Sequence, residues 1–291
     1  MQFSPGRGDR RTEWKEGVAA KKRFGQHFLI DEAVLADIIT AADLQPDARV
    51  LEIGPGHGVL TSALAEVVKD DGLILAVEAD RDLVPLLRAR FNSVKRVKVV
   101  SGDILGLPLA SLLEPPYQIV SNLPYSITSP VITKFLLGDY KGRAGEDSPR
   151  PTSMTLLIQK EVAERLTADA GDRNRGVLTV LVELFGQAEL IRLVSPEAFD
   201  PRPKVESAVV RIEVGEPGAE PGAFLQLLKA GFANKRRQLH NSLAGSLHLS
   251  ADDAKALLDR AEVNPLLRAE QLDLAAWLRL FAVVTEAVRR A

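Results

Sequence analysis

Residues 50–58 read VLEIGPGHG, an apolar run that leads into three glycines placed two positions apart. The apolar run predicts a short buried strand, and the glycines predict a tight turn with backbone dihedral angles that other residues avoid. Helical periodicity follows at once, over residues 58–68. A strand, a glycine-rich turn and a helix in this order open a parallel α/β sheet, and the turn is placed to approach a ligand.

The alternation of apolar strands and amphipathic helices continues outward from this turn to about residue 167. Strands are predicted at residues 50–53, 73–77, 97–100, 118–121 and 154–158, and helices at 58–68, 81–91, 129–137 and 160–167. Residues 177–185 predict a buried helix, and residues 190–194 and 208–214 predict an antiparallel pair of strands at the sheet edge. The expected class is an α/β, Rossmann-like fold with a seven-stranded, mostly parallel sheet that has one antiparallel edge strand.

The pattern changes after residue 214. A stretch rich in Gly, Pro and Glu at 215–222 predicts a linker, and Ser250 is placed to cap a later helix. Helices are predicted at residues 224–233, 235–247, 251–261 and 272–288, and a polar surface loop at 138–151. We therefore expect four parts: a basic N-terminal arm at 1–30, an α/β domain at 31–215, a linker at 216–222 and a small all-helical domain at 223–291.

Composition excludes several classes of site. The chain has 291 residues with no cysteine and only four histidines, so it has no disulfide, no thiolate zinc site and no cysteine nucleophile. No HExxH pattern is present, and no metal is expected. No apolar run approaches the roughly 18 residues of a membrane helix, and no secretory signal opens the chain. We expect a cytoplasmic protein that does not enter the membrane, with a monomer as the default state.

Positive charge gathers at two places, although the formal net charge of the chain is −2. Residues 1–30 hold seven Lys/Arg against three acids, and residues 229–237 hold four with no acid. A single basic run is usually a solvated face, but two such runs flanking an α/β domain favour a nucleic-acid surface. The residues expected to bind RNA are Lys21, Lys22, Arg23, Lys235, Arg236 and Arg237.

Two carboxylates stand where successive predicted strands end. Glu78 lies twenty residues after Gly58, a position from which a carboxylate can accept both hydroxyls of a ribose. Asp103 follows the next strand and can receive an adenine amino group. Either acid alone is more often a turn or capping residue. Together with a glycine loop that lacks Lys and Arg, they predict an adenosine-type ligand without phosphates. The glycine spacing differs from the G-x-G-x-x-G of dinucleotide-binding domains.

The segment from Asn122 to Tyr125 follows the fourth strand and suits chemistry on an adenine amino group. That nitrogen is a poor nucleophile because its lone pair is delocalised into the ring. The Asn122 side-chain oxygen and the Leu123 carbonyl can accept its two hydrogens, and Pro124 stiffens the loop without adding a donor. Tyr125 can stack on a base that has left its helix. In isolation an ordinary turn is an equally good interpretation. No His or Lys stands beside this segment in the sequence, so we expect water to take the proton.

These segments together resemble the KsgA/RsmA family of S-adenosylmethionine-dependent ribosomal RNA adenine dimethyltransferases over nearly the whole chain. The matching stretches are the glycine loop and residues 23–29, 77–78, 102–103, 122–125, 199–207 and 231–239. The resemblance implies a class I methyltransferase fold and S-adenosyl-L-methionine as cofactor. The cofactor-binding residues that it implies are His27, Leu29, Gly54, Gly56, Glu78, Asp103 and Asn122. The family often has Asn where this chain has His27. The resemblance also implies that Phe199 packs against the target adenine, opposite Tyr125.

The resemblance further implies N6,N6-dimethylation of two adjacent adenosines near the 3′ end of 16S rRNA, with a role in small-subunit biogenesis. The residues implied to act on the base are Asn122, Leu123, Pro124, Tyr125 and Phe199. An Erm-type enzyme acting on 23S rRNA shares the core motifs, but residues 199–207 and the basic run 235–237 favour the small-subunit enzyme. An inactive RNA-binding assembly factor of the same fold is the alternative from another class. A DNA adenine methyltransferase and an NAD-binding domain fit less well.

Overall fold

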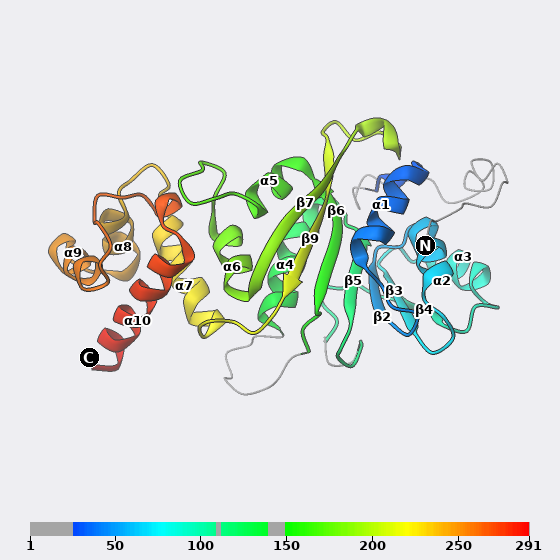
Figure 1. Ribbon diagram of the computed structural model, residues 1–291, viewed down its shortest axis with the longest axis horizontal. Helices are drawn as coiled ribbons and strands as arrows, with labels where there is room; N and C mark the ends of the chain where they lie inside the picture. The colour runs from blue at the N-terminus through cyan, green and yellow to red at the C-terminus, as the bar shows by residue number, and fades with distance from the viewer. Residues whose placement is uncertain (1–25, 109–111, 139–148, 291) are drawn as a thin grey trace. The chain divides into compact units, whose positions relative to one another are not determined.

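The computed structural model describes residues 26–108, 112–138 and 149–290, and contacts between Cα atoms divide the chain into two compact units (Figure 1). The first unit runs through the described residues to Ala163 and includes Glu189–Val214. The second comprises Glu164–Ala188 and Gly215–Ala291. Most of the predicted basic arm and of the predicted loop at 138–151 lies outside the described residues. Across the described ranges, no helix is both long enough and apolar enough to span a membrane.

A seven-stranded sheet forms the centre of the first unit, in the order β4-β3-β2-β5-β6-β9-β7. The strands are β2 (Arg49–Ile53), β3 (Leu73–Glu78), β4 (Val97–Ser101), β5 (Gln118–Asn122), β6 (Ser153–Gln159), β7 (Gly186–Val194) and β9 (Ser207–Val214). Strands β4, β3, β2, β5 and β6 pair in parallel, and β9 pairs antiparallel with β6. Strand β7 lies beside β9 at the edge. The predicted fold class is confirmed, with the antiparallel strand one place in from the edge.

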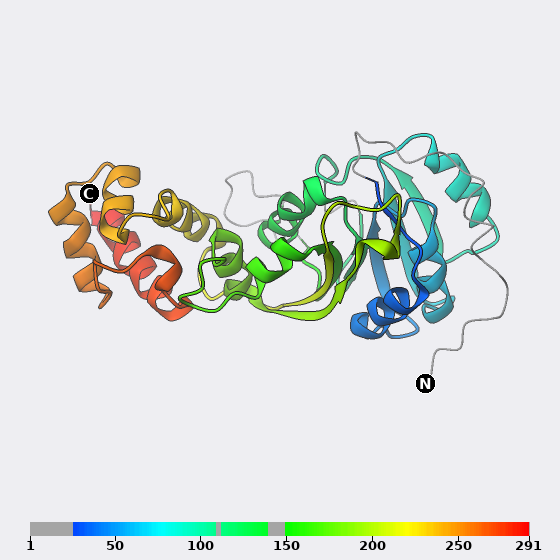
Figure 2. The same ribbon diagram turned by 90° about the horizontal axis from the view of Figure 1, so that it is seen from above.

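Helices cover the sheet because the parallel strands β2, β3, β5 and β6 are each followed by a helical segment. The helices of this unit are α1 (Glu32–Ala42), α2 (Val59–Val67), α3 (Leu83–Arg90) and α4 (Thr128–Leu137). Helix α5 (Lys160–Leu166) begins in this unit and continues past its boundary at Ala163. Buried residues of α1, α2 and α3, such as Ile38, Leu64 and Leu87, join one core cluster with the sheet. Helix α4 buries Ile132 and Phe135 outside that cluster, and Figure 2 shows α1 (blue) and α4 (green) on opposite faces. The central strands are therefore buried on both sides, and a ligand can reach them only at their ends.

A small two-stranded sheet joins segments that are far apart in the sequence. Strand β1 (Phe28–Leu29) pairs antiparallel with β8 (Phe199–Asp200), which follows the 3₁₀ turn η4 (Pro196–Ala198). The pairing sets Leu29 opposite Phe199, and both side chains are at most 5% exposed. Through this pairing, the segment that begins at Gln26 comes to lie over the ends of the central strands.

The second unit is helical. Its elements are α6 (Val177–Phe185), α7 (Pro221–Phe232), α8 (Leu239–Leu247), α9 (Ala251–Arg260), η5 (Ala269–Gln271) and α10 (Leu274–Arg290). Ser250 caps α9 as predicted, since its side chain accepts from the Asp253 N–H. Helix α7 begins at Pro221, because the Glu220 carboxylate caps its first turn and proline suits that position.

The helix predicted at 235–247 is wrong at its start, since α8 begins only at Leu239. Gln238 has an extended backbone, with φ −62° and ψ 150°, and the Leu239 N–H donates to the Leu267 carbonyl rather than along a helix. Lys235, Arg236 and Arg237 consequently lie in an exposed turn between α7 and α8. A basic run that reads as helical on periodicity is thus held as a turn by a tertiary hydrogen bond.

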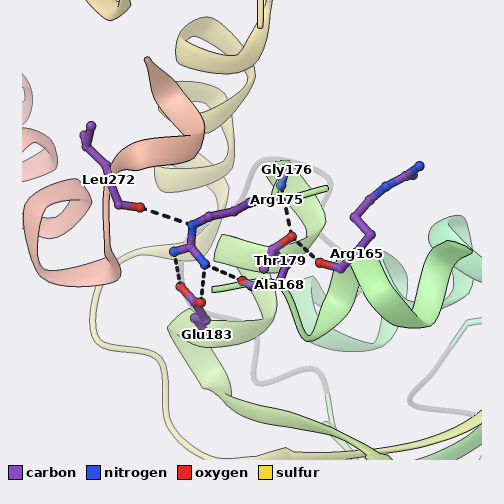
Figure 3. A network of polar contacts seen from close by, with 7 residues as sticks. All are labelled: Arg165, Ala168, Arg175, Gly176, Thr179, Glu183 and Leu272. Atoms are coloured by element: carbon purple, nitrogen blue, oxygen red, sulfur yellow. Dashed lines mark hydrogen bonds and ion pairs between the residues drawn. The ribbon is translucent and has the colours of Figure 1, made fainter. Parts of the chain in front are cut away.

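A buried arginine ties the segment 164–188 to the C-terminal helices of this unit (Figure 3). The Arg175 side chain is 1% exposed, and its guanidinium forms a bidentate pair with Glu183. The same group donates to the Ala168 carbonyl at 3.0 Å and to the Leu272 carbonyl at 3.1 Å. The five N–H donors of a planar guanidinium serve four acceptor oxygens here, whereas a lysine ammonium has only three donors. The loop before α6 is therefore fixed to the start of α10 by one side chain.

Candidate active site

The carboxyl ends of the parallel strands surround a cavity of about 480 Å³. It lies where the strand order reverses, between β2 and β5, which is the usual ligand position in open α/β sheets. Ten of the residues predicted from the sequence line this cavity: His27, Leu29, Gly54, Gly56, Glu78, Asp103, Asn122, Leu123, Pro124 and Tyr125. They come from five separate segments of the chain, and the topology of the sheet brings them together.

The glycine loop forms the floor of the cavity and has the left-handed backbone that the sequence predicted. Gly54 and Gly56 have φ +68° and +60°, values that strain any residue with a side chain. A Cβ on Gly56 would lie 2.9 Å from the Phe28 ring, and one on Gly54 would lie 3.6 Å from Pro124 Cδ. The loop is thus enclosed between the β1 segment and the turn after β5, so a ligand meets backbone rather than side chains here.

The two predicted carboxylates occupy different environments. Glu78 is 5% exposed, and its oxygens accept the N–H groups of Gly56 at 3.1 Å and of Asp80 at 2.8 Å. Burial raises its pKa, an effect that these backbone hydrogen bonds partly offset. Asp103 is exposed at the cavity mouth and accepts the Leu105 N–H at 3.0 Å. Each acid accepts a hydrogen bond within its own turn, and both also line the cavity. A role in the turn and a role in ligand binding are therefore compatible for both residues.

Asn122 ends β5, and its side-chain amide has a defined orientation. Its Nδ2 donates to the His27 backbone carbonyl at 3.1 Å, so the Oδ1 atom is left as an acceptor for another donor. The Leu123 N–H donates to the Leu157 carbonyl at 3.1 Å, which fixes the backbone that carries the next carbonyl. Two acceptors on adjacent residues are what the sequence predicted for an amino group with two hydrogens.

Tyr125 and His27 form a pair of rings on the same wall. The ring centroids are 5.6 Å apart and the planes differ by 28°. The Tyr125 hydroxyl and Ser207 Oγ are hydrogen-bonded at 2.6 Å, and burial raises the pKa of this phenol, so it stays protonated at neutral pH. His27 Nδ1 lies 2.7 Å from the Pro201 carbonyl, which can only accept, so Nδ1 carries a proton.

No histidine neighbours Asn122 in the sequence, but His27 lies beside it in the structure. His27 is 95 positions from Asn122 in the sequence, but its backbone and ring both adjoin the segment that follows β5. Sequence distance could not show this proximity, because the β1–β8 pairing creates it. The only signal was the resemblance, which had already assigned His27 to the cofactor site.

Phe199 is not brought to the cavity. It is 1% exposed, packs in the core cluster with Leu29, Val194 and Ala198, and is absent from the cavity lining. Phe199 therefore does not lie in the cavity opposite Tyr125, where the resemblance placed it. The physical reason is its pairing with Leu29 across β1 and β8, which directs the ring inward.

The residues expected to bind RNA lie outside the cavity. Lys21, Lys22 and Arg23 fall outside the described residues. Lys235 belongs to the second unit, where its Nζ donates to the Arg175 carbonyl at 3.0 Å. Arg236 and Arg237 are exposed beside it.

The further lining residues that sequence reasoning did not assign to the site include Gln26, Phe28, Glu52 and His57. Glu52 is the most unusual, since it is 1% exposed within a strand that is otherwise apolar. Thr61 Oγ1 donates to it at 2.6 Å, and desolvation raises its pKa to about 8. A carboxylate inside an apolar strand directly before the glycine loop is the signal that could have identified it.

We expect the stability of the protein to fall between about pH 4.5 and pH 8 because of Glu52. The folded chain keeps this proton up to about pH 8, whereas the unfolded chain loses it near 4.5. The unfolded state therefore binds fewer protons in this range, and the free energy of unfolding decreases as pH rises, by on the order of 4 kcal/mol for this group. Urea unfolding at several pH values should show a flatter profile for Glu52→Gln. Glu216→Gln, at an exposed carboxylate, is the control, and equal slopes for wild type and Glu52→Gln would refute the assignment.

Comparison with known proteins agrees with this geometry. The chain matches the family described as ribosomal RNA adenine dimethylase over residues 17–286. It is 39% identical over 282 residues to ribosomal RNA small subunit methyltransferase A of Dehalococcoides mccartyi, covering 94% of this chain and 92% of that protein. It is 41% identical over 277 residues to the protein of the same name from Rippkaea orientalis, covering 92% and 98%.

Solved structures show the same fold. The structure of the 23S rRNA methyltransferase ErmE is similar with a TM-score of 0.66 and 29% identity, covering 89% of this chain and 99% of that one. A dimethyladenosine transferase from Plasmodium falciparum has a TM-score of 0.73 and 24% identity, covering 89% and 98%. On its matched residues and its cavity, the chain belongs to the ribosomal RNA adenine dimethylase family of S-adenosylmethionine-dependent methyltransferases.

Proposed function

We propose that this protein transfers methyl groups from S-adenosyl-L-methionine to the N6 atoms of two adjacent adenosines near the 3′ end of 16S rRNA. Each adenosine becomes N6,N6-dimethyladenosine, and the reaction accompanies small-subunit biogenesis. The observation that carries this proposal is the orientation of Asn122, whose Nδ2 is bound to His27 so that Oδ1 is available to an amino group. The relatives that are 39–41% identical over more than nine-tenths of the chain are named for the small subunit.

The cavity fits the cofactor. Its volume of about 480 Å³ lies in the usual range for small-molecule sites, and the glycine loop leaves backbone exposed where side chains would obstruct. Leu29, Gly54 and Gly56 would hold the ligand by shape, and Glu78 and Asp103 would accept hydrogen bonds from ribose and adenine. The cofactor supplies an electrophilic methyl group on a positively charged sulfur.

The residues beyond the cofactor position the target base. Asn122 Oδ1 and the Leu123 carbonyl accept the two hydrogens of the amino group, which turns the nitrogen lone pair toward the methyl group. The Tyr125 ring, fixed by Ser207, offers a face on which an unstacked adenine can lie. The N–C bond forms as the C–S bond breaks, and the nitrogen then releases a proton to water, since only the methylated nitrogen is acidic. A second methylation requires that the monomethyl base return to the same place.

The remaining predictions concern the context of this site. The basic arm and the exposed turn at 235–237 would contact rRNA phosphates and add affinity without sequence choice. We also propose a division into arm, catalytic domain, linker and helical domain. The predicted linker at 216–222 is too long at its end, since α7 begins at Pro221, and the helical unit also takes in Glu164–Ala188. The protein would act as a monomer in the cytoplasm, where ribosomal subunits assemble.

Labelling of undermethylated ribosomal subunits tests the function. We expect the purified protein and a radioactive methyl donor to label small subunits, and mass spectrometry to find two neighbouring dimethyladenosines near the 3′ end of 16S rRNA. Label confined to large subunits would instead identify an Erm-type enzyme, although the chain is only 29% identical to ErmE. Binding to small subunits without any label would identify an assembly factor that lacks catalysis.

A further inference from the structure

A further concentration of positive charge lies in residues 81–98 of the first unit, outside both predicted basic segments. This stretch holds six Lys/Arg against one acid, while the whole chain has a net charge of −2. The residues are Arg81, Arg88, Arg90, Lys95, Arg96 and Lys98, with Asp82 as the acid. They lie just before α3, on α3, on the turn after it and on β4, which is an edge strand of the sheet (Figure 1).

Three of these cations form what we name the α3–β4 surface: Arg88, Lys95 and Lys98. All three are exposed. None of them has a carboxylate of the described residues within ion-pair distance. Arg96 differs, since it pairs with Asp70 and donates to the Ala65 carbonyl. No carboxylate of the described residues therefore neutralises the charge of this surface.

The α3–β4 surface also contains a hollow. Arg88 and Lys95 line a hollow of about 360 Å³ together with Asn92 and the apolar residues Phe91, Val94, Val97 and Val99. The Arg88 guanidinium is held over β4, because its Nε and NH2 groups donate to the Val99 carbonyl at 3.4 and 3.3 Å. A guanidinium fixed in this way loses less freedom when it binds an anion.

The surface connects with the cavity at the other end of α3. Arg81 lines the cavity, and Arg90 donates to the carbonyl of His57 in the glycine loop at 3.1 Å. The Phe91 ring packs under the same loop, since a Cβ on Gly58 would lie 2.7 Å from it. Arg81 and Arg90 thus place positive groups of the same stretch beside the cavity and its glycine loop.

We propose that the α3–β4 surface binds backbone phosphates of the RNA substrate, so that the unit that carries the cavity also holds RNA outside the target base. This inference rests on the proposed function for the identity of the substrate. Uncompensated, exposed cations on a helix end and an edge strand suit an extended polyanion, because each phosphate contact also releases condensed counterions. Lys98 alone could serve only to protect an edge strand from pairing. That purpose leaves the hollow between Arg88 and Lys95 unexplained.

The test combines three substitutions, Arg88→Gln, Lys95→Gln and Lys98→Gln. We expect affinity for undermethylated small subunits to fall about ten- to a hundredfold near 0.1 M salt, and the slope of log affinity against log salt to decrease by about two to three. Cofactor binding and kcat should stay at the wild-type level while KM for RNA rises. The same salt titration is repeated with large subunits and with an RNA duplex. Because phosphate contacts do not depend on base sequence, these RNAs measure the contribution of the α3–β4 surface apart from recognition of the target.

A matched control removes the same number of positive charges from residues whose charge is paired with a carboxylate. It replaces by Gln three cations that are 43–47% exposed and paired with carboxylates, namely Arg49, Lys255 and Arg260. We expect this variant to bind as wild type does. Equal losses in both variants, or an unchanged salt slope in the first, would overturn the proposal, as would a wild type that binds none of the three RNAs. Failure of the proposed function looks different: small subunits stay unlabelled, yet the two variants still differ in RNA binding.

Discussion

Asn122→Ala is expected to lower kcat for methyl transfer by about a thousandfold while cofactor affinity changes little. The substitution removes Oδ1, one of two acceptors for the amino group, and acceptors of this kind contribute 10²–10³ in rate in other enzymes. It also removes the hydrogen bond from Nδ2 to the His27 carbonyl, which holds the β1 segment against the end of β5. Single-turnover transfer to undermethylated small subunits, together with calorimetric titration of the cofactor, separates the two effects.

Asn122→Asp provides the matched comparison. It keeps an acceptor at the position of Oδ1 but places an oxygen against the His27 carbonyl in place of the donor. We expect this variant to retain more activity than Asn122→Ala and to bind the cofactor less tightly than wild type. Transfer at the wild-type rate by Asn122→Ala would show that the amide has no part in positioning the base.

The sequence was sufficient to predict the site residues that lie at the ends of strands. Gly54, Glu78, Asp103 and Asn122 each follow a buried strand, and parallel strands bring their carboxyl ends to one edge. Any correct prediction of the strands therefore places these four residues around one cavity. Local pattern also placed the cap of α9 at Ser250, because a cap is decided within four residues of the chain.

The remainder depends on contacts that local pattern does not encode. His27 reaches Asn122 and Phe199 turns into the core for one reason, the pairing of two short strands about 170 positions apart. Two-residue strands have no periodicity to detect. The turn at 233–238 similarly depends on the hydrogen bond from Leu239 to Leu267.

Arg175→Met is expected to destabilise the protein by about 3 kcal/mol, the low end of the usual cost of removing one partner from a buried ion pair, because the Glu183 side chain is 30% exposed and stays partly hydrated. The variant leaves the Glu183 carboxylate without its bidentate partner, and leaves the carbonyls of Ala168 and Leu272 without this donor (Figure 3). Urea unfolding of the full chain measures the loss. Hydrogen exchange should increase first in the second unit, which contains all four residues. Arg173→Met, at an exposed arginine two positions earlier, is the control and should change stability by less than about 0.5 kcal/mol.

A double substitution distinguishes the ion pair from the backbone contacts. Adding Glu183→Leu to Arg175→Met removes the uncompensated carboxylate, and apolar replacement of a whole buried pair is often close to neutral. The carbonyls of Ala168 and Leu272 would still lack their donor, at about 1–3 kcal/mol for each group that stays buried and unsatisfied. We therefore expect the double variant to recover only part of the loss. Full recovery would mean that Arg175 serves Glu183 alone, and no recovery would mean that its main role is to join the loop before α6 to the start of α10.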